Sequence, residues 1–158
     1  MEALATRVGQ RLKAARAKLV TAESCTGGWA AQAVTSVAGS SAWFERGFVT
    51  YSNDAKRELL GVREDTLRTH GAVSEETARE MAQGALSRGK GTVALAVTGV
   101  AGPGGGSPGK PVGTVCFAWA SARSVRSETQ QFAGDRESVR RQSVVRALEG
   151  VLQQLDGG

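Results

Sequence analysis

Apolar positions along the chain alternate between a spacing typical of helices and one typical of strands. Over residues 3–17, Leu, Val and Ala recur about one helical turn apart, which predicts an amphipathic helix. Residues 19–22 have the composition of a short strand, residues 29–37 predict the next helix, and residues 44–51 again resemble a strand. The first third of the chain therefore alternates helix and strand.

The alternation continues to the C-terminus. The pattern predicts a helix capped by Asn53 or Asp54 and ending at Gly61, a helix starting at Ser74, strands over residues 92–98, 114–120 and 128–132, and a helix over residues 135–155. The strand at 92–98 is apolar almost throughout, which is typical of a strand covered on both faces. We therefore expect one α/β domain over residues 1–158, with helices on both faces of a single sheet.

Composition narrows the class of protein. The 158 residues are 41% hydrophobic and 22% charged, which is typical of a globular domain. No apolar run approaches the roughly 20 residues of a membrane-spanning helix, and the N-terminus lacks the apolar core of a signal peptide, so we expect a cytoplasmic location. Two cysteines, Cys25 and Cys116, are too few for a disulfide framework or a zinc cluster.

The net charge of +5 favours acidic ligands, such as a nucleic acid or a phosphorylated metabolite. However, the chain contains no run of five or six like charges, and it has few aromatic residues that could stack on bases. A modestly basic enzyme has the same composition, so nucleic-acid binding is only a secondary hypothesis.

The turn Ala22–Gly28, with the sequence Ala-Glu-Ser-Cys-Thr-Gly-Gly, is the first candidate for chemistry. It joins a predicted strand to a predicted helix, which places its serine at the carboxyl edge of the sheet, where open α/β folds bind ligands. Four backbone N–H groups follow and could stabilise an oxyanion or hold a phosphate, namely those of Cys25, Thr26, Gly27 and Gly28. The alternative is a Thr26 helix cap followed by glycines chosen for tight packing.

Ser24 is the serine of this turn, and it needs a base to act as a nucleophile. The single histidine, His70, is interpreted as an exposed loop residue. Lys56 follows a strand that should end at the same sheet edge, and its amine can accept a proton near neutral pH if burial or positive charge lowers its pKa. Tyr51 could relay a proton or orient this amine. A solvated lysine at position 56 and a nucleophilic Cys25 remain as alternatives.

Two further segments could contact an anion. The loop 104–111 nearly matches a Walker A motif, but a proline replaces the Ser or Thr that would bind magnesium, so we interpret it as a flexible glycine-rich segment beside Thr98 and Gly99. Arg136 and Arg140 lie one turn apart at the start of the last predicted helix. They could bind an anion together with the helix N-terminus, or they could form a solvated face.

Together these motifs resemble the CinA C-terminal domain family. The resemblance runs from about Val8 to Leu155 and rests on segments in the family's order: Thr21–Gly28, Gly39–Asn53 with Lys56, His70–Ser74, Thr98–Pro103, Lys110–Val115 and Gly134–Arg136. It implies a three-layer α/β/α sandwich with a mixed, mostly parallel sheet. Longer members carry an additional N-terminal domain, whose activities are not expected here.

Members consisting of this domain alone are nicotinamide-nucleotide amidases. The resemblance thus implies hydrolysis of nicotinamide mononucleotide to nicotinate mononucleotide and ammonia, in pyridine nucleotide recycling, without a metal or other cofactor. It implies that Ser24 is the nucleophile, Lys56 its general base and Tyr51 an assisting residue. Together with the turn after the first strand, it also implies the residues that bind the substrate, with Arg136 preferred for the phosphate. These residues are Cys25, Thr26, Gly27, Gly28, Ser41, Thr98, Gly99, Arg136 and Arg140.

The resemblance also implies a homo-oligomer, most simply a dimer. Two other functions remain open. The positive charge, and the competence-related name of the longer relatives, would suit a non-catalytic binding module. An amidase that acts on another phosphorylated amide would use the same residues.

Overall fold

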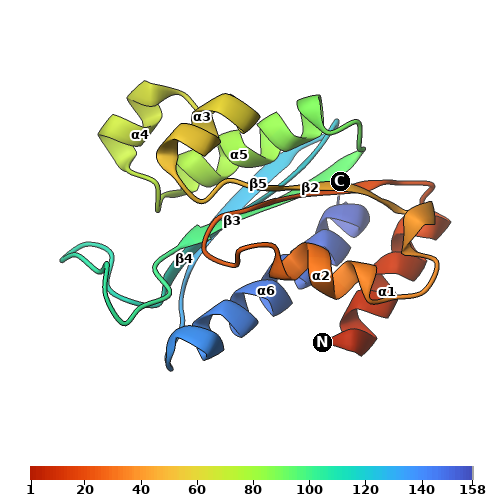
Figure 1. Ribbon diagram of the computed structural model, residues 1–158. Helices are drawn as coiled ribbons and strands as arrows, with labels where there is room; N and C mark the ends of the chain where they lie inside the picture. Colours follow the sequence, from red (N-terminus) through yellow and green to blue (C-terminus); the bar gives the residue numbers. More distant parts are fainter. Residues whose placement is uncertain (158) are drawn as a thin grey trace.

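The computed structural model describes residues 1–157 and consists of one sheet between two layers of helices (Figure 1). Its elements are α1 (Glu2–Ala14), β1 (Leu19–Glu23), α2 (Trp29–Thr35), the 3-10 turn η1 (Ser40–Ala42), β2 (Phe44–Val49), α3 (Asn53–Leu60), α4 (Glu64–His70), α5 (Glu75–Arg88), β3 (Val93–Gly99), β4 (Thr114–Ser121), β5 (Val125–Gln131) and α6 (Arg136–Gly157). The alternation predicted from the apolar pattern is confirmed.

The sheet has the strand order β2-β1-β3-β4-β5. Strand β1 pairs in parallel with β2 and β3, whereas β3 with β4 and β4 with β5 are antiparallel. The expectation of a mixed sheet is therefore confirmed, but the sheet is evenly mixed rather than mostly parallel. Strands β3, β4 and β5 follow one another without a helix between them, and only antiparallel neighbours can be joined so directly.

Helices α1, α2 and α6 cover one face of the sheet, and α3, α4 and α5 cover the other (Figure 1). Successive side chains of a strand point to opposite faces, so Leu19 belongs to the core under α1 and α6, while Val20 and Ala22 belong to the core under α5. By the same alternation, Ser24 and Thr98 lie on the α3–α5 face. Side-chain partners of Ser24 are therefore expected from α3, α4 and α5 rather than from the helices on the other face.

Three local features differ from the sequence-based expectations. Helix α4 was not predicted, because only Thr66 of its seven residues is buried and the segment has no apolar stripe. His70 ends this helix rather than lying in a loop. The cap of α3 is Ser52, whose hydroxyl accepts a hydrogen bond from the Ala55 N–H at 3.0 Å, so the prediction of Asn53 or Asp54 was wrong.

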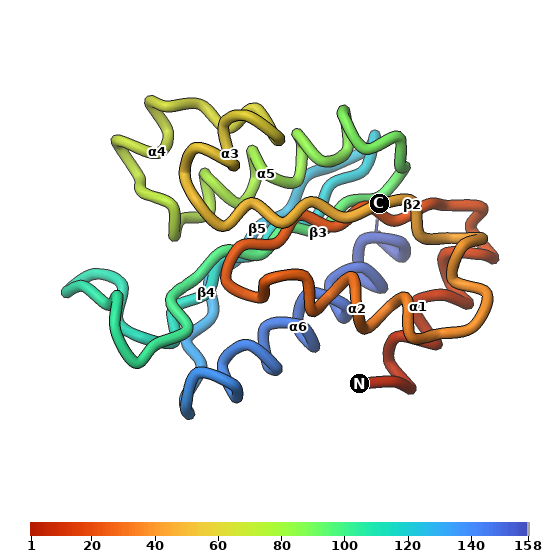
Figure 2. The backbone as a smooth tube through the Cα atoms, viewed as in Figure 1, coloured from red at the N-terminus to blue at the C-terminus, as the bar shows by residue number. Residues whose placement is uncertain are grey.

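Figure 2 follows the backbone from β3 into β4 through the glycine-rich segment, which extends beyond the sheet at the end where β3 finishes. Because β1 and β3 are parallel, this is also the end where β1 runs into the turn before α2. The segment therefore borders the sheet edge where the candidate chemistry lies. In the described part of the chain, none of the helices combines the length and apolarity needed to cross a membrane.

Candidate active site

The turn after β1 redirects the chain sharply into α2. The Ser24 N–H donates to the Val97 carbonyl at 3.0 Å, which extends the pairing of β1 with β3 by one residue. The Gly27 N–H then donates to the Ser24 carbonyl at 3.1 Å. Gly27 and Gly28 have φ values of 61° and 103°, which glycine adopts readily and other residues rarely do. The two glycines therefore allow α2 to begin immediately beyond Ser24.

Glu23 holds the start of α2 in place. Its carboxylate is fully buried and accepts hydrogen bonds from the Thr26 hydroxyl at 2.6 Å and from the N–H groups of Ala30 and Ala31 at 2.8 and 3.1 Å. These are N–H groups of the first helical turn, which a helix cannot satisfy internally. The cap of α2 is thus Glu23, and the alternative of Thr26 as the cap is wrong.

The side chains of Ser24 and Lys56 meet in the protein interior. Lys56 Nζ lies 2.9 Å from Ser24 Oγ, and it donates to the carbonyl oxygens of Thr50 at 2.8 Å and Tyr51 at 3.3 Å. Lys56 and Leu60 form the buried side of α3, and Lys56 is only 1% exposed. The alternative of a solvated lysine at this position is therefore wrong.

Burial gives Lys56 the chemistry of a base. Removal from water disfavours the charged ammonium and lowers the pKa of Lys56 from 10.5 to about 8. A neutral amine has two N–H bonds, and the Thr50 and Tyr51 carbonyls can accept both. The nitrogen lone pair is then left for the Ser24 hydroxyl. The arrangement can remove the proton of Ser24, as nucleophilic catalysis requires.

Cys25, the competing nucleophile, has a different environment. Its side chain is 6% exposed and belongs to the core on the α1–α2–α6 face, opposite to that of Lys56. Burial raises the pKa of the Cys25 thiol to about 12. Since the thiolate is the reactive form of cysteine, the structure favours Ser24 over Cys25.

Tyr51 and Thr98 both lie next to the Ser24–Lys56 pair. Thr98 follows the β3 residue that accepts the Ser24 N–H, and its hydroxyl donates to the Ala72 carbonyl at 2.9 Å. Gly99 comes next, at the end of β3. Tyr51 contacts Lys56 through its carbonyl, whereas its exposed hydroxyl lies 3.4 Å from the Arg136 guanidinium. The predicted proton relay through that hydroxyl therefore has no direct contact with Lys56 in this structure.

The two candidate arginines have different partners. Arg136 is exposed, and its guanidinium donates to the Gly102 carbonyl at 2.8 Å. Arg140 is partly buried and donates to the carbonyls of Cys25 at 3.1 Å and Thr26 at 3.0 Å. Arg136 thus faces the glycine-rich segment and Tyr51, and Arg140 faces the turn itself.

Ser41 does not join this site within one chain, which corrects its assignment to the same group as Ser24. It is an exposed residue of η1, directly before β2. Strands β1 and β2 are parallel, with Leu19 opposite Phe44 and Glu23 opposite Val49. Ser41 precedes β2, whereas Ser24 follows β1. The two residues therefore lie at opposite ends of these parallel strands.

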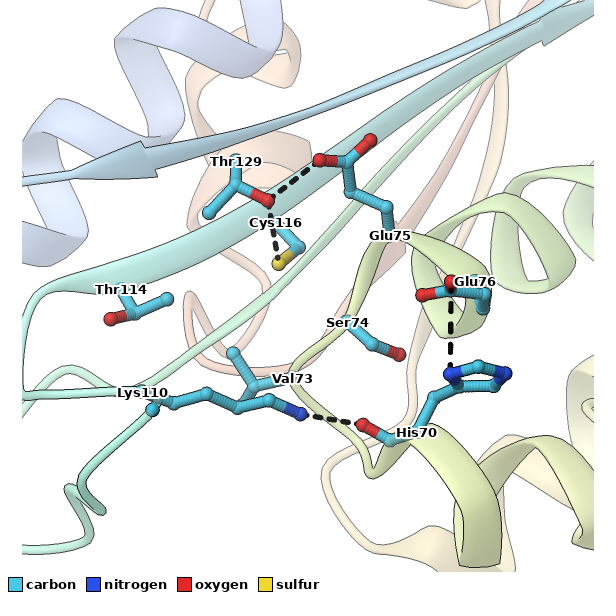
Figure 3. Close-up of a pocket in the computed structure, with 10 residues that line it drawn as sticks. His70, Val73, Ser74, Glu75, Glu76, Lys110, Thr114, Cys116 and Thr129 are labelled. Atoms are coloured by element: carbon cyan, nitrogen blue, oxygen red, sulfur yellow. Dashed lines mark hydrogen bonds and ion pairs between the residues drawn. The ribbon is translucent and has the colours of Figure 1, made fainter.

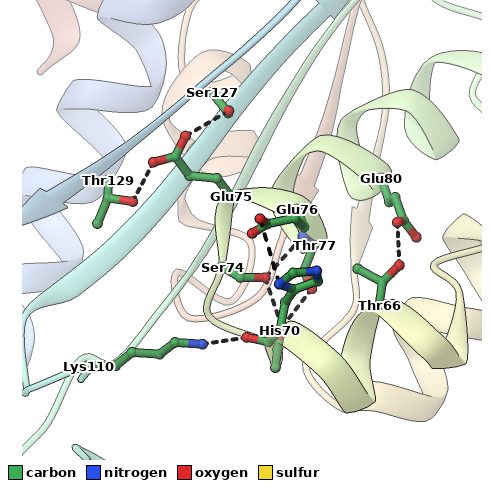
Figure 4. Close-up of polar contacts among 11 residues, drawn as sticks. Thr66, His70, Ser74, Glu75, Glu76, Thr77, Glu80, Lys110, Ser127 and Thr129 are labelled. Atoms are coloured by element: carbon green, nitrogen blue, oxygen red, sulfur yellow. Dashed lines mark hydrogen bonds and ion pairs between the residues drawn. The ribbon is translucent and has the colours of Figure 1, made fainter. Parts of the chain in front are cut away.

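A second polar cluster lies farther along the same sheet face. A pocket of about 500 Å³ there is lined by the end of α4, the segment before α5, the first turn of α5, strands β4 and β5, and the glycine-rich segment (Figure 3). The lining residues are His70, Val73, Ser74, Glu75, Glu76, Gly109, Lys110, Thr114, Cys116 and Thr129. Glu75 accepts hydrogen bonds from Ser127 and Thr129, and Lys110 donates to the His70 carbonyl (Figure 4). These polar groups largely satisfy one another. Among the described residues, the pocket therefore has no buried amine beside a hydroxyl like that of the Ser24–Lys56 pair.

Sequence reasoning did not identify Glu23 or this pocket. The signal for Glu23 was an acidic residue seven positions before Ala30, in a helix whose own N-cap residue, Gly28, has no side chain that could cap it. Glu75 lies in the first turn of α5, and no local pattern in the sequence indicates its contact with β5. Within residues 1–157, no three His, Cys, Asp or Glu side chains are grouped so that they could hold a metal ion.

Comparisons with known proteins agree with this architecture. A family model described as the CinA C-terminal domain matches residues 1–155. The nicotinamide-nucleotide amidohydrolase PncC of Escherichia coli K12 is 57% identical over 96% of this chain and 92% of its own length, and that of Pseudomonas putida is 56% identical over 95% and 94%.

Solved structures agree as well. The competence/damage inducible protein CihA from Agrobacterium tumefaciens superposes with a TM-score of 0.94 at 48% identity, covering 98% of this chain and 94% of that one. A CinA superfamily protein from Klebsiella pneumoniae superposes with a TM-score of 0.96 at 41% identity, covering 99% and 98%. The chain therefore belongs to the CinA C-terminal domain family, as its motifs predicted.

Proposed function

We propose that this protein is a nicotinamide-nucleotide amidohydrolase that hydrolyses the carboxamide of nicotinamide mononucleotide through an acyl-enzyme on Ser24. The observation that carries the proposal is the buried Lys56 amine, 2.9 Å from Ser24 Oγ and with its pKa lowered to about 8. Relatives that are 56–57% identical over nearly the whole chain bear the name of this activity.

In the first half of the reaction, Lys56 Nζ takes the Ser24 hydroxyl proton and Ser24 Oγ attacks the carboxamide carbon. The resulting oxyanion needs hydrogen-bond donors, and the backbone N–H groups that follow Ser24 are suited to this role. The C–N bond then breaks, Lys56 returns the proton to the leaving nitrogen, and ammonia departs. Ser24 is left as an ester of nicotinate mononucleotide.

In the second half, water attacks this ester. Lys56 takes a proton from the water and passes it to Ser24 Oγ as the ester bond breaks. Nicotinate mononucleotide leaves, and the pair returns to its starting state. Lys56 gives back each proton that it accepts within the cycle, so the reaction needs no other proton donor or acceptor from the protein.

The simplest experiment is ammonia release from nicotinamide mononucleotide by the purified protein in the presence of EDTA. We expect multiple turnovers and the formation of nicotinate mononucleotide. Absence of turnover on this substrate, with turnover on a different phosphorylated amide, would contradict the substrate assignment. Absence of turnover on any amide, with salt-dependent binding to DNA, would support the binding module instead.

The lowered pKa of Lys56 predicts a particular pH dependence. Only the neutral amine can accept the Ser24 proton, so kcat/KM should rise by about tenfold per pH unit below the pKa of the free enzyme and level off above about 8. In the bound complex the pyridinium charge disfavours the ammonium further, so kcat should level off at a lower pH than kcat/KM. Rates measured from pH 5.5 to 9.5 test this; a rate that falls as pH rises through 8 would contradict a neutral base.

Arg136 is the residue we assign to the 5′-phosphate, because it is exposed and sits at the start of α6, where helix N–H groups also favour an anion. Arg136→Ala should raise KM by about 10- to 100-fold, since a charge-assisted hydrogen bond contributes about 1.5–3 kcal/mol. The value of kcat should change much less. Arg141→Ala, which removes an exposed arginine paired with Glu137, is the matched control and should leave KM unchanged. A kcat loss without a KM change in Arg136→Ala would contradict the assignment.

The dimeric state implied by the family resemblance and the cytoplasmic location expected from the apolar pattern both stay predictions.

A further inference from the structure

The N–H groups of the turn after β1 fall into two sets. The N–H of Ser24 donates to Val97, and that of Gly27 donates to the Ser24 carbonyl. Those of Cys25, Thr26 and Gly28 have no hydrogen-bond partner among residues 1–157. Two adjacent donors directly after the nucleophile are thus left available to a ligand. The N–H of the residue after the nucleophile is also the oxyanion donor of the α/β-hydrolase elbow.

Arg140 holds two carbonyls of this turn, and the first of them shares its peptide group with the Thr26 N–H. Its Nε donates to the Cys25 carbonyl at 3.1 Å, and its Nη2 donates to the Thr26 carbonyl at 3.0 Å. The fork of a guanidinium suits two adjacent acceptors, because its donors lie in one fixed plane. Two consecutive carbonyls of the turn are therefore held by one side chain of α6.

The contact of Arg140 with the Cys25 carbonyl determines where the Thr26 N–H points. A peptide group is planar and trans, so its N–H points away from its C=O. With the Cys25 carbonyl held toward α6, the Thr26 N–H points away from α6. Helix α6 covers the sheet face opposite to that of α3, which carries Lys56. The Thr26 N–H is thus turned toward the side of the turn where Ser24 and Lys56 meet.

Arg140 is itself fixed from outside the turn. Its guanidinium carbon lies 5.5 Å from the centre of the Trp29 ring, and the guanidinium of Arg141 lies 5.2 Å from the same ring. Arg141 makes its ion pair with Glu137, and neither of its contacts involves the turn. Arg140 and Arg141 therefore both contact the Trp29 ring and both carry a positive charge, but only Arg140 donates to the carbonyls of Cys25 and Thr26.

We propose that Arg140 is a positioning residue for the oxyanion site: it fixes the peptide group between Cys25 and Thr26 so that the Thr26 N–H, beside that of Cys25, receives the developing negative charge. This inference rests on the proposed acyl-enzyme at Ser24. It removes Arg140 from the phosphate-binding candidates, because its Nε and Nη2 already donate to two backbone carbonyls.

The test is steady-state kinetics of Arg140→Met on nicotinamide mononucleotide, with Arg141→Met as the matched control. A misplaced oxyanion donor affects the transition state and not the bound substrate, so kcat should fall by about 10- to 100-fold while KM stays within about threefold. Arg140→Lys retains the charge and can hold one carbonyl, so its kcat should lie between those of Arg140→Met and the wild type. Arg141→Met should behave as the wild type.

Three outcomes would overturn the inference. A rise in KM at unchanged kcat in Arg140→Met would make Arg140 a substrate-binding residue. Wild-type kinetics in Arg140→Met would show that the turn holds its shape unaided. An equal loss of kcat and melting temperature in Arg140→Met and Arg141→Met would indicate a general effect of the Trp29 stack. If Arg140→Met fails to fold, Arg140→Lys decides by the same kcat and KM criteria. Failure of the proposed function itself is seen separately, as an inactive wild type.

Discussion

Ser24→Ala should lower ammonia release from nicotinamide mononucleotide by a factor of about 10⁴ to 10⁶, the range seen when the nucleophile of a hydrolase is removed. Without Oγ no ester can form, and the buried Lys56 amine has no hydroxyl to deprotonate. Ser24 is 7% exposed and its side chain contacts Lys56, so the truncation removes few packing contacts. The measurement is kcat/KM with a sensitive ammonia assay, together with the melting temperature.

The matched control for this variant is the neighbouring cysteine. Cys25→Ala removes a thiol that packs in the opposite core and whose pKa is raised to about 12, so it should cost stability rather than chemistry. We expect its kcat to stay within about threefold of the wild type. An active Ser24→Ala beside an inactive Cys25→Ala would reverse the assignment of the nucleophile.

Lys56→Met should reduce kcat nearly as far as Ser24→Ala, because residues that act as one unit lose most of their effect when either is removed. Methionine retains much of the length and the apolar stem of lysine but cannot accept a proton. We therefore expect a loss of about 10³- to 10⁵-fold in kcat, and a residual rate that no longer rises through pH 8. The pH profile distinguishes a lost base from a merely disturbed fold.

Two further variants sharpen this test. Lys56→Arg retains a positive charge, but a guanidinium cannot act as a base near pH 7, so it should also be inactive. Lys56→Ala leaves space that a small primary amine could enter, and added propylamine should restore part of the rate. Retained activity in Lys56→Arg would exclude Lys56 as the base.

The pairing of Ser24 with Lys56 could be predicted because it depends on simple topology. Each residue follows a strand with apolar composition, and two parallel neighbours bring the ends of such strands to one sheet edge. The buried state of Lys56 could not be predicted in the same way. It depends on the α3–α5 packing that closes over the amine, which involves residues far along the chain.

The same reasoning explains the errors at Ser41 and in the sheet. Ser41 belongs to a segment that resembles the family, but it lies before β2, whereas Ser24 follows β1 and Lys56 follows β2. The sheet implied by the family resemblance was mostly parallel. The last three strands contradict this, because the glycine-rich segment and the short connection between β4 and β5 reverse the chain without a helix.

The role of Arg140 depends on contacts that no local pattern contains. Its spacing from Arg136 suggested that the two arginines act together on an anion. In the structure the two arginines have different partners: Arg136 donates to the Gly102 carbonyl, and Arg140 donates to the carbonyls of Cys25 and Thr26. Only the packing of α6 beside α2 reveals this difference.

The central claim is that Ser24 carries the substrate as an ester, and trapping this ester tests it most directly. Wild-type protein mixed with nicotinamide mononucleotide, quenched in acid within the first turnover and analysed by intact mass and peptide mapping, should gain the mass of the nucleotide less one ammonia, located on Ser24. The mixing is done near pH 8, because formation of the ester requires the neutral Lys56 amine. Location of the added mass on Cys25, or full turnover by Ser24→Ala, would contradict the account.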